Sequence, residues 1–252
     1  MSGPTSPPSG PLPPPSGPRP WLLALHSSGE SLGVALQRLG VEEEPHLAAF
    51  PLGRALSGAL FGCVEAVLPA EQWRSLGRLA VATGPGGFTG TRLTVAMART
   101  LAQQLALPLD GIGSFALTAR RLRRQGLVEA RPFWVVQTLP RRGLVAGLYG
   151  PEPGPAAGRD GTAGPLLDQG GALLELSAPR LYREPSALAE AEAQLLATAE
   201  DSPAPRCPAD VLQPDDVAEL LRCSQEAAAA GRSAPWAPVL PIYPTSPVDG
   251  SG

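Results

Sequence analysis

The run from Thr83 to Arg92, TGPGGFTGTR, is the part of this chain whose residue types and spacing most directly indicate chemistry. The apolar stretch before it, Arg78 to Ala82, predicts a strand, and Leu93 to Leu105 after it predicts a helix. A glycine-rich turn between a strand and a helix N-terminus can present backbone N–H groups to an anion, or can pack closely against another backbone. The local sequence leaves both roles open.

The glycine run matches neither common nucleotide-binding pattern. It lacks the GK[ST] ending of a P-loop, and Thr89 stands where the final glycine of G-x-G-x-x-G would be. All 20 basic residues of the chain are arginine, which excludes a P-loop lysine or a Schiff-base lysine. Thr89 is instead a suitable N-cap for the following helix.

The other residues able to do chemistry form no recognisable site. His26 follows the predicted strand Trp21–Leu25, at a point where proteins of the actin/hexokinase/Hsp70 type place an aspartate for metal-bound phosphate. An imidazole cannot replace that aspartate at a magnesium site, so we expect a hydrogen-bonding histidine rather than a general base. His46 is too distant in sequence for a paired metal motif, and no serine lies in a G-x-S-x-G context. We therefore expect no metal and no cofactor.

Composition limits the function further. The chain has 252 residues, a net charge of −3 and a pI of about 5.5, so tight binding to nucleic acid by this chain alone is not expected. The arginines of 120–124 are expected at a solvated helix end rather than at an RNA phosphate. No signal peptide or membrane-length apolar run is visible, which predicts a cytoplasmic protein without membrane contact.

Hydrophobic periodicity predicts an α/β protein that begins at Trp21, after a Pro/Ser/Gly-rich tail at 1–20. The predicted strands are Trp21–Leu25, Ser31–Arg38, Leu47–Leu52, Leu76–Thr83, Leu109–Ile112, Phe133–Thr138 and Gly143–Tyr149. The predicted helices are Arg54–Leu68, Leu93–Leu105, Phe115–Arg124, Ser186–Glu200 and Asp215–Ala230. The Gly/Pro-rich segment Gly150–Gly171 is expected to be a loop.

Two of these helices carry a second face of small or apolar residues in addition to their main apolar row. These residues are Ala55, Ala59, Gly62 and Ala66 on the first helix, and Thr94, Val95, Ala98 and Ala102 on the second. Such faces permit close helix packing, either within the chain or against a partner. We take them as the candidate partner interface, and arginine at Ala59 or Ala98 would then block pairing without unfolding the chain.

Several segments together resemble a known family. The glycine run, with Gly84, Pro85, Gly86, Phe88, Thr89, Gly90 and Arg92, resembles the motif GPGSFTGxRIG of the bacterial TsaB (YeaZ) proteins of tRNA threonylcarbamoyladenosine biosynthesis. Leu22–Ser28 resembles their ILAIDTS strand. The sequences of 98–114, 141–149 and 208–243 resemble later family segments in the same order. The resemblance covers about residues 21–246.

The resemblance implies an α/β, two-lobed actin/hexokinase/Hsp70-like (ASKHA, ribonuclease H-like) fold with a Gcp-like domain. It places an N-terminal lobe with dimerisation helices at 21–112, a smaller lobe at 113–246 and a tail at 247–252. It also implies a non-catalytic accessory subunit that pairs with TsaD, or with a second copy of itself, through the helices 54–68 and 88–105. The TsaE ATPase would join the complex, and tRNA would be bound only through this complex.

The sequence departs from the family pattern at four places. His26 replaces the usual aspartate, 54–57 replaces a His-Ser pair, Gly87 replaces a serine, and Pro244-Thr245 replaces a closing Leu-Arg. An ATP-dependent kinase or ATPase of the same superfold remains the enzyme alternative, but it requires an aspartate at position 26. A protease acting on the partner is a third alternative, which no nucleophile–base pair supports.

Overall fold

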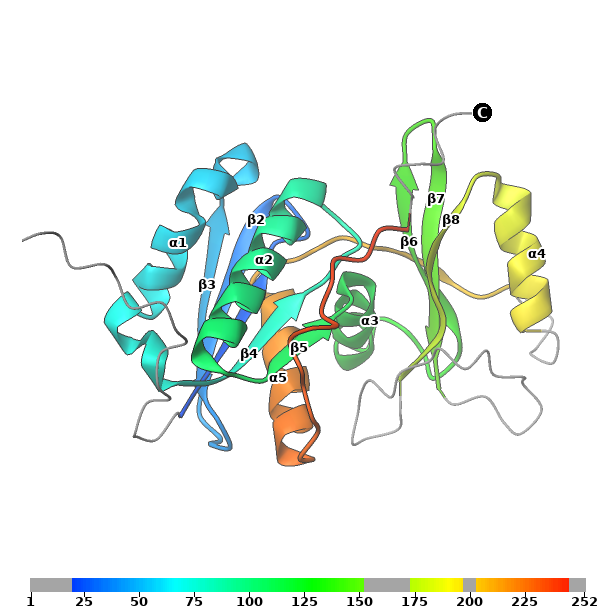
Figure 1. Cartoon of the computed structure of the whole chain (residues 1–252). Coiled ribbons are helices and arrows are strands. Elements are labelled where there is room, and N and C mark those ends of the chain that lie inside the picture. Colours follow the sequence, from blue (N-terminus) through cyan, green and yellow to red (C-terminus); the bar gives the residue numbers. More distant parts are fainter. Residues whose placement is uncertain (1–19, 152–172, 197–202, 245–252) are drawn as a thin grey trace, which may run out of the picture.

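The computed structural model describes residues 20–151, 173–196 and 203–244. The predicted tails at 1–20 and 247–252 lie outside these residues except for Pro20, as does nearly all of the predicted loop at 150–171. The described chain contains two β-sheets with helices between them and on their outer faces (Figure 1). Among these residues no helix is both long and apolar enough to cross a membrane.

The first sheet has the strand order β3-β2-β1-β4-β5. Its members are β1 (Trp21–His26), β2 (Ser31–Arg38), β3 (His46–Pro51), β4 (Leu76–Ala82) and β5 (Leu109–Ile112). The first three strands form an antiparallel meander, and β4 and β5 run parallel to β1. The parallel pairs place the carboxyl ends of β1 and β4 at the same edge, where the glycine loop follows β4.

The second sheet repeats the arrangement of the first. Its strands are β6 (Phe133–Leu139), β7 (Gly143–Gly150), β8 (Leu174–Tyr182) and β9 (Arg206–Pro208), in the order β8-β7-β6-β9. Again three strands form an antiparallel meander, and the next strand pairs in parallel with the first. The chain thus consists of two α/β lobes with one topology, which confirms the two-lobed α/β fold class expected from the resemblance.

Helices separate and cover the sheets. They are α1 (Leu56–Val67), α2 (Phe88–Leu105), α3 (Ser114–Arg124), α4 (Pro185–Leu195) and α5 (Asp215–Ala229), with short 3₁₀ turns at Gly53–Ala55 and Ala70–Ser75. Helices α1 and α2 pack on the outer face of the first sheet, and α4 packs on β7 and β8 (Figure 1). Between the sheets α5 packs on β1 and β2, whereas α3 packs on β6 and β7. Each sheet therefore has one of these two helices on its inner face.

Strand β1 is buried on both faces, and its side chains alternate between two cores. Leu22 and Ala24 join the core between the sheets, which contains α3 and α5, whereas Leu23 and Leu25 join the core beneath α1 and α2. A strand covered on both faces reads as a continuous apolar run. This explains why Trp21–Leu25 lacks the polar alternation of a half-exposed strand.

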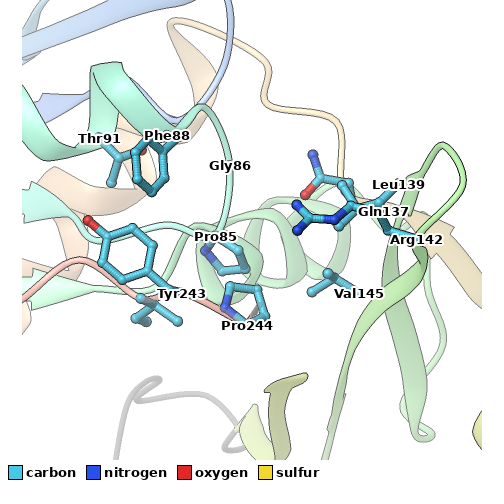
Figure 2. A pocket seen from close by; sticks show the side chains of 11 residues that line it. Pro85, Gly86, Phe88, Thr91, Gln137, Leu139, Arg142, Val145, Tyr243 and Pro244 are labelled. Atoms are coloured by element: carbon cyan, nitrogen blue, oxygen red, sulfur yellow. The ribbon is translucent and has the colours of Figure 1, made fainter. Parts of the chain in front are cut away.

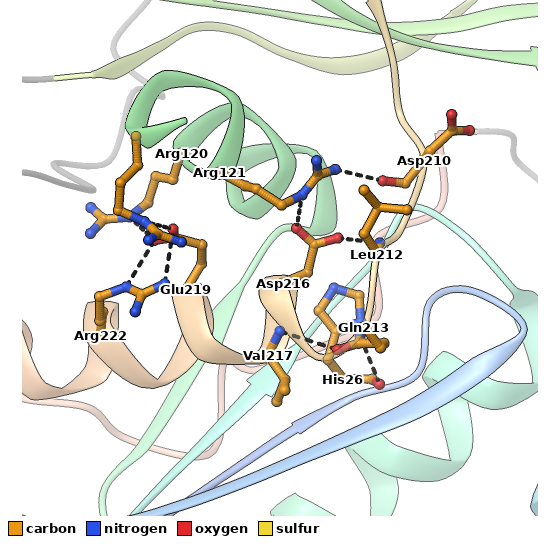
Figure 3. A network of polar contacts seen from close by, with 11 residues as sticks. His26, Arg120, Arg121, Asp210, Leu212, Gln213, Asp216, Val217, Glu219 and Arg222 are labelled. Carbon is orange, nitrogen blue, oxygen red and sulfur yellow. Dashed lines mark hydrogen bonds and ion pairs between the residues drawn. The ribbon is translucent and has the colours of Figure 1, made fainter. Parts of the chain in front are cut away.

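Arg120 and Arg121 of α3 are buried and paired with acids of α5, which corrects the expectation of a solvated helix end for these two residues. Arg124 is paired but 49% exposed, and Arg123 is half-buried. Arg121 and Asp216 of α5 are both buried, and the Arg121 Nε lies 2.7 Å from the Asp216 Oδ1 (Figure 3). Arg120 Nη2 donates to Glu226 at 2.8 Å, and Arg124 pairs with the buried Glu219. These ion pairs join the two crossing helices at the centre of the molecule.

The sequence analysis did not predict two strands, β8 and β9. Both lie at the edges of the second sheet, and both contain a proline, Pro179 in β8 and Pro208 in β9. Proline cannot donate a ladder hydrogen bond and is therefore found in sheets mainly on edge strands. Proline is tolerated in an edge strand, but it also interrupts the residue pattern from which a strand is predicted. This is why both strands were missed.

The ion pair between α3 and α5 gives a first prediction. Arg121→Met should lower the free energy of unfolding by about 3–5 kcal/mol, because Asp216 would remain buried without its countercharge. Arg123→Met is the matched control. Arg123 lies two residues further along α3 and is only half-buried, so this change should lower the free energy of unfolding by less than about 1 kcal/mol. Urea denaturation measures both, and equal losses would contradict a specific role for the Arg121–Asp216 pair.

Candidate functional site: the glycine loop and the cavity beside it

The glycine loop packs directly on the turn between β1 and β2. The Gly87 N–H donates a hydrogen bond to the carbonyl oxygen of Ser28 at 2.7 Å. A Cβ built at Gly86 would overlap that same carbonyl and the Ser28 Cβ. Gly84 has a φ of +90°, a conformation that side chains rarely adopt. Gly86 is thus required for the close approach of two backbones, and Gly84 for the conformation of the loop.

A cluster of buried hydroxyl groups lies beneath this contact. Its members come from the β1–β2 turn, from α2 and from the start of α3: Ser27, Ser28, Thr91, Thr94 and Ser114. Ser28 Oγ is hydrogen-bonded to Thr91 Oγ1 at 3.2 Å and to Ser114 Oγ at 2.7 Å. Ser27 and Thr94 share a second hydroxyl hydrogen bond. The cluster joins three elements that are distant in sequence.

These contacts decide between the two roles left open by the sequence. The Ser28 carbonyl receives the Gly87 N–H, which is one of the groups an anion would need. The Gly84 carbonyl accepts the Ser114 N–H at 2.7 Å, which holds the other end of the loop. The loop therefore serves to join the β1–β2 turn to α2 and α3, with Gly86 and Gly87 packed directly on Ser28. A cavity of about 530 Å³, lined among others by Gly29, Gly87 and Thr89, opens beside this contact.

His26 is completely buried at the end of β1. Its Nδ1 accepts a hydrogen bond from the Ser28 N–H at 3.4 Å, and its Nε2 has no partner among the described residues. Burial lowers the pKa of the imidazole to about 3, so it is neutral at physiological pH. The expectation of a hydrogen-bonding histidine is confirmed. No three His, Cys, Asp or Glu side chains of the described chain are grouped so that they could hold a metal ion.

The eight residues predicted as a partner interface fall into two groups that differ in their exposure to solvent. Those of α2, namely Thr94, Val95, Ala98 and Ala102, are at most 1% exposed and lie in the chain's own interior. On the first helix Ala55, Gly62 and Ala66 are exposed and Ala59 is half-buried. The α2 residues are therefore unavailable to a partner, and the expectation that arginine at Ala98 would leave the fold intact is wrong.

The start of α2 differs from the prediction that Thr89 caps the helix. Helix α2 begins at Phe88, as the resemblance implied and five residues earlier than the periodicity predicted, and its N-cap is Gly87, without a capping side chain. Thr89 therefore lies inside the first turn and is not the N-cap. Phe88 is 54% exposed, and Arg92 stacks on its ring at 4.2 Å from the centroid.

A cavity of about 470 Å³ opens beside the loop (Figure 2). Its walls come from the loop and α2, from the β6–β7 hairpin and from the C-terminal segment. The lining residues are Pro85, Gly86, Phe88, Thr91, Gln137, Leu139, Arg142, Val145, Ile242, Tyr243 and Pro244. The sequence analysis named site residues only on the loop side of this cavity, although Arg142 and Tyr243 lie in segments that resemble the family. Gln137 and Arg142 were missed because they lie about 50 residues away, in a hairpin with no motif of its own for binding.

The loop contact predicts different effects for two adjacent glycines. Gly86→Ala should destabilise the protein by about 1–3 kcal/mol, because the new Cβ overlaps the Ser28 carbonyl. Gly87→Ala is the control, since its Cβ would meet the same oxygen at an ordinary 3.5 Å and its φ is −57°. Thermal unfolding of both variants measures the difference. Equal stability would show that the loop does not rest on the turn.

Burial of His26 predicts a pH dependence of stability. Because the folded pKa of about 3 lies below the unfolded value of about 6.5, the unfolded state binds the proton first. The stability that the neutral imidazole supplies is complete above pH 6.5 and is lost as the pH falls toward 3, with a loss of about 2 kcal/mol at pH 5. His26→Asn keeps an acceptor for the Ser28 N–H but does not titrate. Its stability relative to the parent should therefore rise by that amount between pH 7 and pH 5 in urea denaturation, and parallel pH profiles would contradict this.

Comparison with known proteins places these features in a family. The family model "TsaD: tRNA N6-adenosine threonylcarbamoyltransferase" matches residues 54–182, just over half of the chain. The curated "tRNA threonylcarbamoyladenosine biosynthesis protein TsaB" of Bacillus subtilis is 30% identical over 132 residues, which are 51% of this chain and 54% of that protein. The match thus spans about half the length of this curated relative.

Solved structures agree with the fold. A protein of Pseudomonas aeruginosa described as similar to peptidase YEAZ superposes with a TM-score of 0.61 at 21% identity, over 90% of this chain and 100% of that one. YeaZ of the same organism gives a TM-score of 0.59 at 20% identity, over 89% and 99% of the two chains. These two similarities establish the fold, and the family-model match establishes the relationship by sequence. The chain belongs to the family that this TsaD model describes.

Proposed function

We propose that this chain is an accessory subunit in tRNA threonylcarbamoyladenosine biosynthesis that does no chemistry itself. It binds and activates a TsaD subunit, which forms the threonylcarbamoyl group on N6 of the tRNA adenosine beside the anticodon. The family relationship supports the pathway. The observation that supports a role in binding is the exposed face of α1, which presents Phe61 among small residues, with Ser57 and Glu65 beside it, and which no other described segment covers.

Helix α1 contains residues that lower its own stability, and a helix that faces only solvent would have no reason to contain them. Gly58 and Gly62 lie in its interior, and a Cβ at either would meet nothing within 4 Å. Glycine in a helix interior costs roughly 0.5–1 kcal/mol relative to alanine, so both positions forgo stability. Phe61 lies between them with 57% of its surface exposed. Small residues around an exposed aromatic ring suit the close approach of a second helix.

The glycine loop supports the accessory role over the kinase or ATPase alternative. That alternative requires phosphate-binding amides in the loop and a carboxylate at position 26. The Gly87 amide is instead bonded to Ser28, and position 26 holds a neutral histidine. The interface on α1 would be used for TsaD in the complex and for a second copy of this chain in isolation. The TsaE ATPase and the tRNA are then brought together by the assembled complex, in the cytoplasm.

The proposal is tested by size-exclusion chromatography of this chain mixed with the TsaD of its own organism. A single complex at micromolar concentration is expected. Gly62→Arg places a long charged side chain on the exposed α1 face, where it has open space in the free chain. It should therefore weaken pairing at least tenfold, which corresponds to about 1.4 kcal/mol, and leave the circular dichroism spectrum unchanged.

Leu127→Ser is the matched control, because Leu127 is 65% exposed and lies beyond the end of α3, away from α1. It should leave pairing intact. Two separate peaks for the unmodified proteins would overturn the proposal, and so would equal loss of pairing in both variants. The same columns run with this chain alone show whether it forms a homodimer through α1, which Gly62→Arg should then also disrupt.

A further inference from the structure

The two sheets have four edges, formed by β3 and β5 in the first sheet and by β8 and β9 in the second. An edge strand presents unpaired backbone N–H and C=O groups, and proteins protect such edges with prolines, charges, bulges or a covering segment. Strand β5 is covered, because the Leu109 N–H donates to the Ala234 carbonyl of the C-terminal segment at 2.8 Å. Strand β9 has three residues and ends at Pro208, whereas β8 contains Pro179, Arg180 and two irregularities in its register. These three edges are therefore protected.

Strand β3 has none of these protections before its last residue (Figure 1). Its six residues, HLAAFP, include no Asp, Glu, Lys or Arg, and its only proline is the final Pro51. All six pair with β2 without a break in register, and no described residue outside β2 is hydrogen-bonded to their backbone. The central side chains, Ala48 and Ala49, are small and at least partly exposed. The chain thus presents a free strand edge about 20 Å long.

The segments that flank β3 carry opposite charges. Three exposed residues, Glu42, Glu43 and Glu44, lie shortly before the strand, and the exposed Arg54 lies shortly after it. Glu42, Glu44 and Arg54 make no ion pair with any other described residue. One end of the free edge is therefore negative and the other end is positive, and these charges are available to a partner.

This charge pattern favours one orientation for a second copy of the chain. In a parallel pair the glutamates of both copies would lie together, whereas in an antiparallel pair the glutamates of each copy lie beside the Arg54 of the other. Two identical antiparallel strands pair about a two-fold axis, and the registers that pair most residues are centred on Ala48 or on Ala49. The first register places Arg54 level with Glu42 of the second copy, and the other places it level with Glu44. Both registers therefore bring opposite charges together.

We propose that β3 is the docking surface for a second copy of this chain, which adds its own β3 in antiparallel orientation and joins the two five-stranded sheets into one. Backbone hydrogen bonds supply the affinity, as in other cases of strand addition, and the flanking charges set the orientation. The contact is isologous and closed, so it occupies both free edges and leaves neither for further association. It goes beyond the proposed function and does not use the exposed face of α1, which points away from the sheet and remains available to TsaD.

Disulfide cross-linking of the full chain tests the proposal. Ala48→Cys and Ala49→Cys are each combined with Gly62→Arg, which blocks pairing through α1, and are oxidised with glutathione disulfide. The variant whose new cysteine lies at the two-fold axis should form a covalent dimer about tenfold or more faster than Ala178→Cys in the same background. Ala178 is the matched control, because it is an exposed alanine of the edge strand β8, next to Pro179. Gly62→Arg alone gives the background from the chain's own three cysteines.

Two further pairs of variants, also with Gly62→Arg, are compared by analytical ultracentrifugation at micromolar to millimolar concentration. Ala49→Lys places a charge on the free edge and should prevent dimer formation, whereas Ala178→Lys should not. Arg54→Glu should weaken the dimer about fivefold, because both symmetry-related charge contacts become repulsive. Arg183→Glu, the same charge change at an exposed position beyond β8, should leave the dimer unchanged. Circular dichroism checks that each variant is folded.

Cross-linking of both Ala48→Cys and Ala49→Cys at no more than the rate of Ala178→Cys would overturn the proposal. A Gly62→Arg variant that stays monomeric at millimolar concentration would also overturn it, since any association of the parent chain would then run through α1. The partner experiment gives a separate answer. Gly62→Arg should remove co-elution with TsaD and keep the β3 dimer, whereas Ala49→Lys should remove the β3 dimer and keep co-elution with TsaD.

Discussion

The contact between Ser28 and the glycine loop determines the geometry of everything around it. The Ser28 carbonyl holds the loop, and its hydroxyl is hydrogen-bonded to the first turn of α2 and to the start of α3. One residue of the β1–β2 turn thus fixes where α2 begins and in which direction it runs. That direction places α2 beside α1 on the first sheet, and it places Phe88 at the mouth of the cavity. A buried, fully bonded hydroxyl cluster can do this because each of its groups would cost free energy if left unpaired.

The two sheets share one topology, and the two helices packed between them must be held in one register. Ion pairs between these helices meet this requirement. Helix α5, which follows the second sheet in the chain, packs on the first sheet, whereas α3, which follows the first sheet in the chain, packs on the second. The two helices therefore contact each other between the sheets. Arginines on α3 face acids on α5 there, and the central pair, Arg121 and Asp216, is nearly inaccessible to solvent. Such a pair adds little net stability over an apolar contact, but it penalises any other register of the two helices. The crossing holds the lobes in a fixed relation, and the cavity between them depends on that relation.

The sequence was sufficient to predict most helices and strands. It was not sufficient to predict which neighbouring element covers a buried face. Strands β2 and β5 have the predicted bounds, because their apolar residues and turns are local signals. The small residues of α2 gave a correct signal of two-sided burial but not the identity of the covering surface, since a helix face packs alike against its own chain or another. The arginines of 120–124 misled for the same reason, because their partners lie about 100 residues further along the chain. The far wall of the cavity carries no local signal of binding. Arg142 lies in the family-like segment 141–149, but Gln137 and Arg142 are brought to the cavity only when the two lobes are folded against each other.

The histidine at position 26 and the closed loop are two parts of one arrangement. Position 26 has no exposed surface, and the imidazole Nε2 already lacks a partner among the described residues. A carboxylate at the same place would be an unpaired buried charge, which costs several kcal/mol unless a cation or several donors neutralise it. An aspartate is therefore compatible with this strand end only if the adjacent space is open to a metal-bound ligand. Here the Gly87 amide and the Gly86 backbone fill the space against Ser28, and a neutral side chain at position 26 is the one that the closed loop can accept.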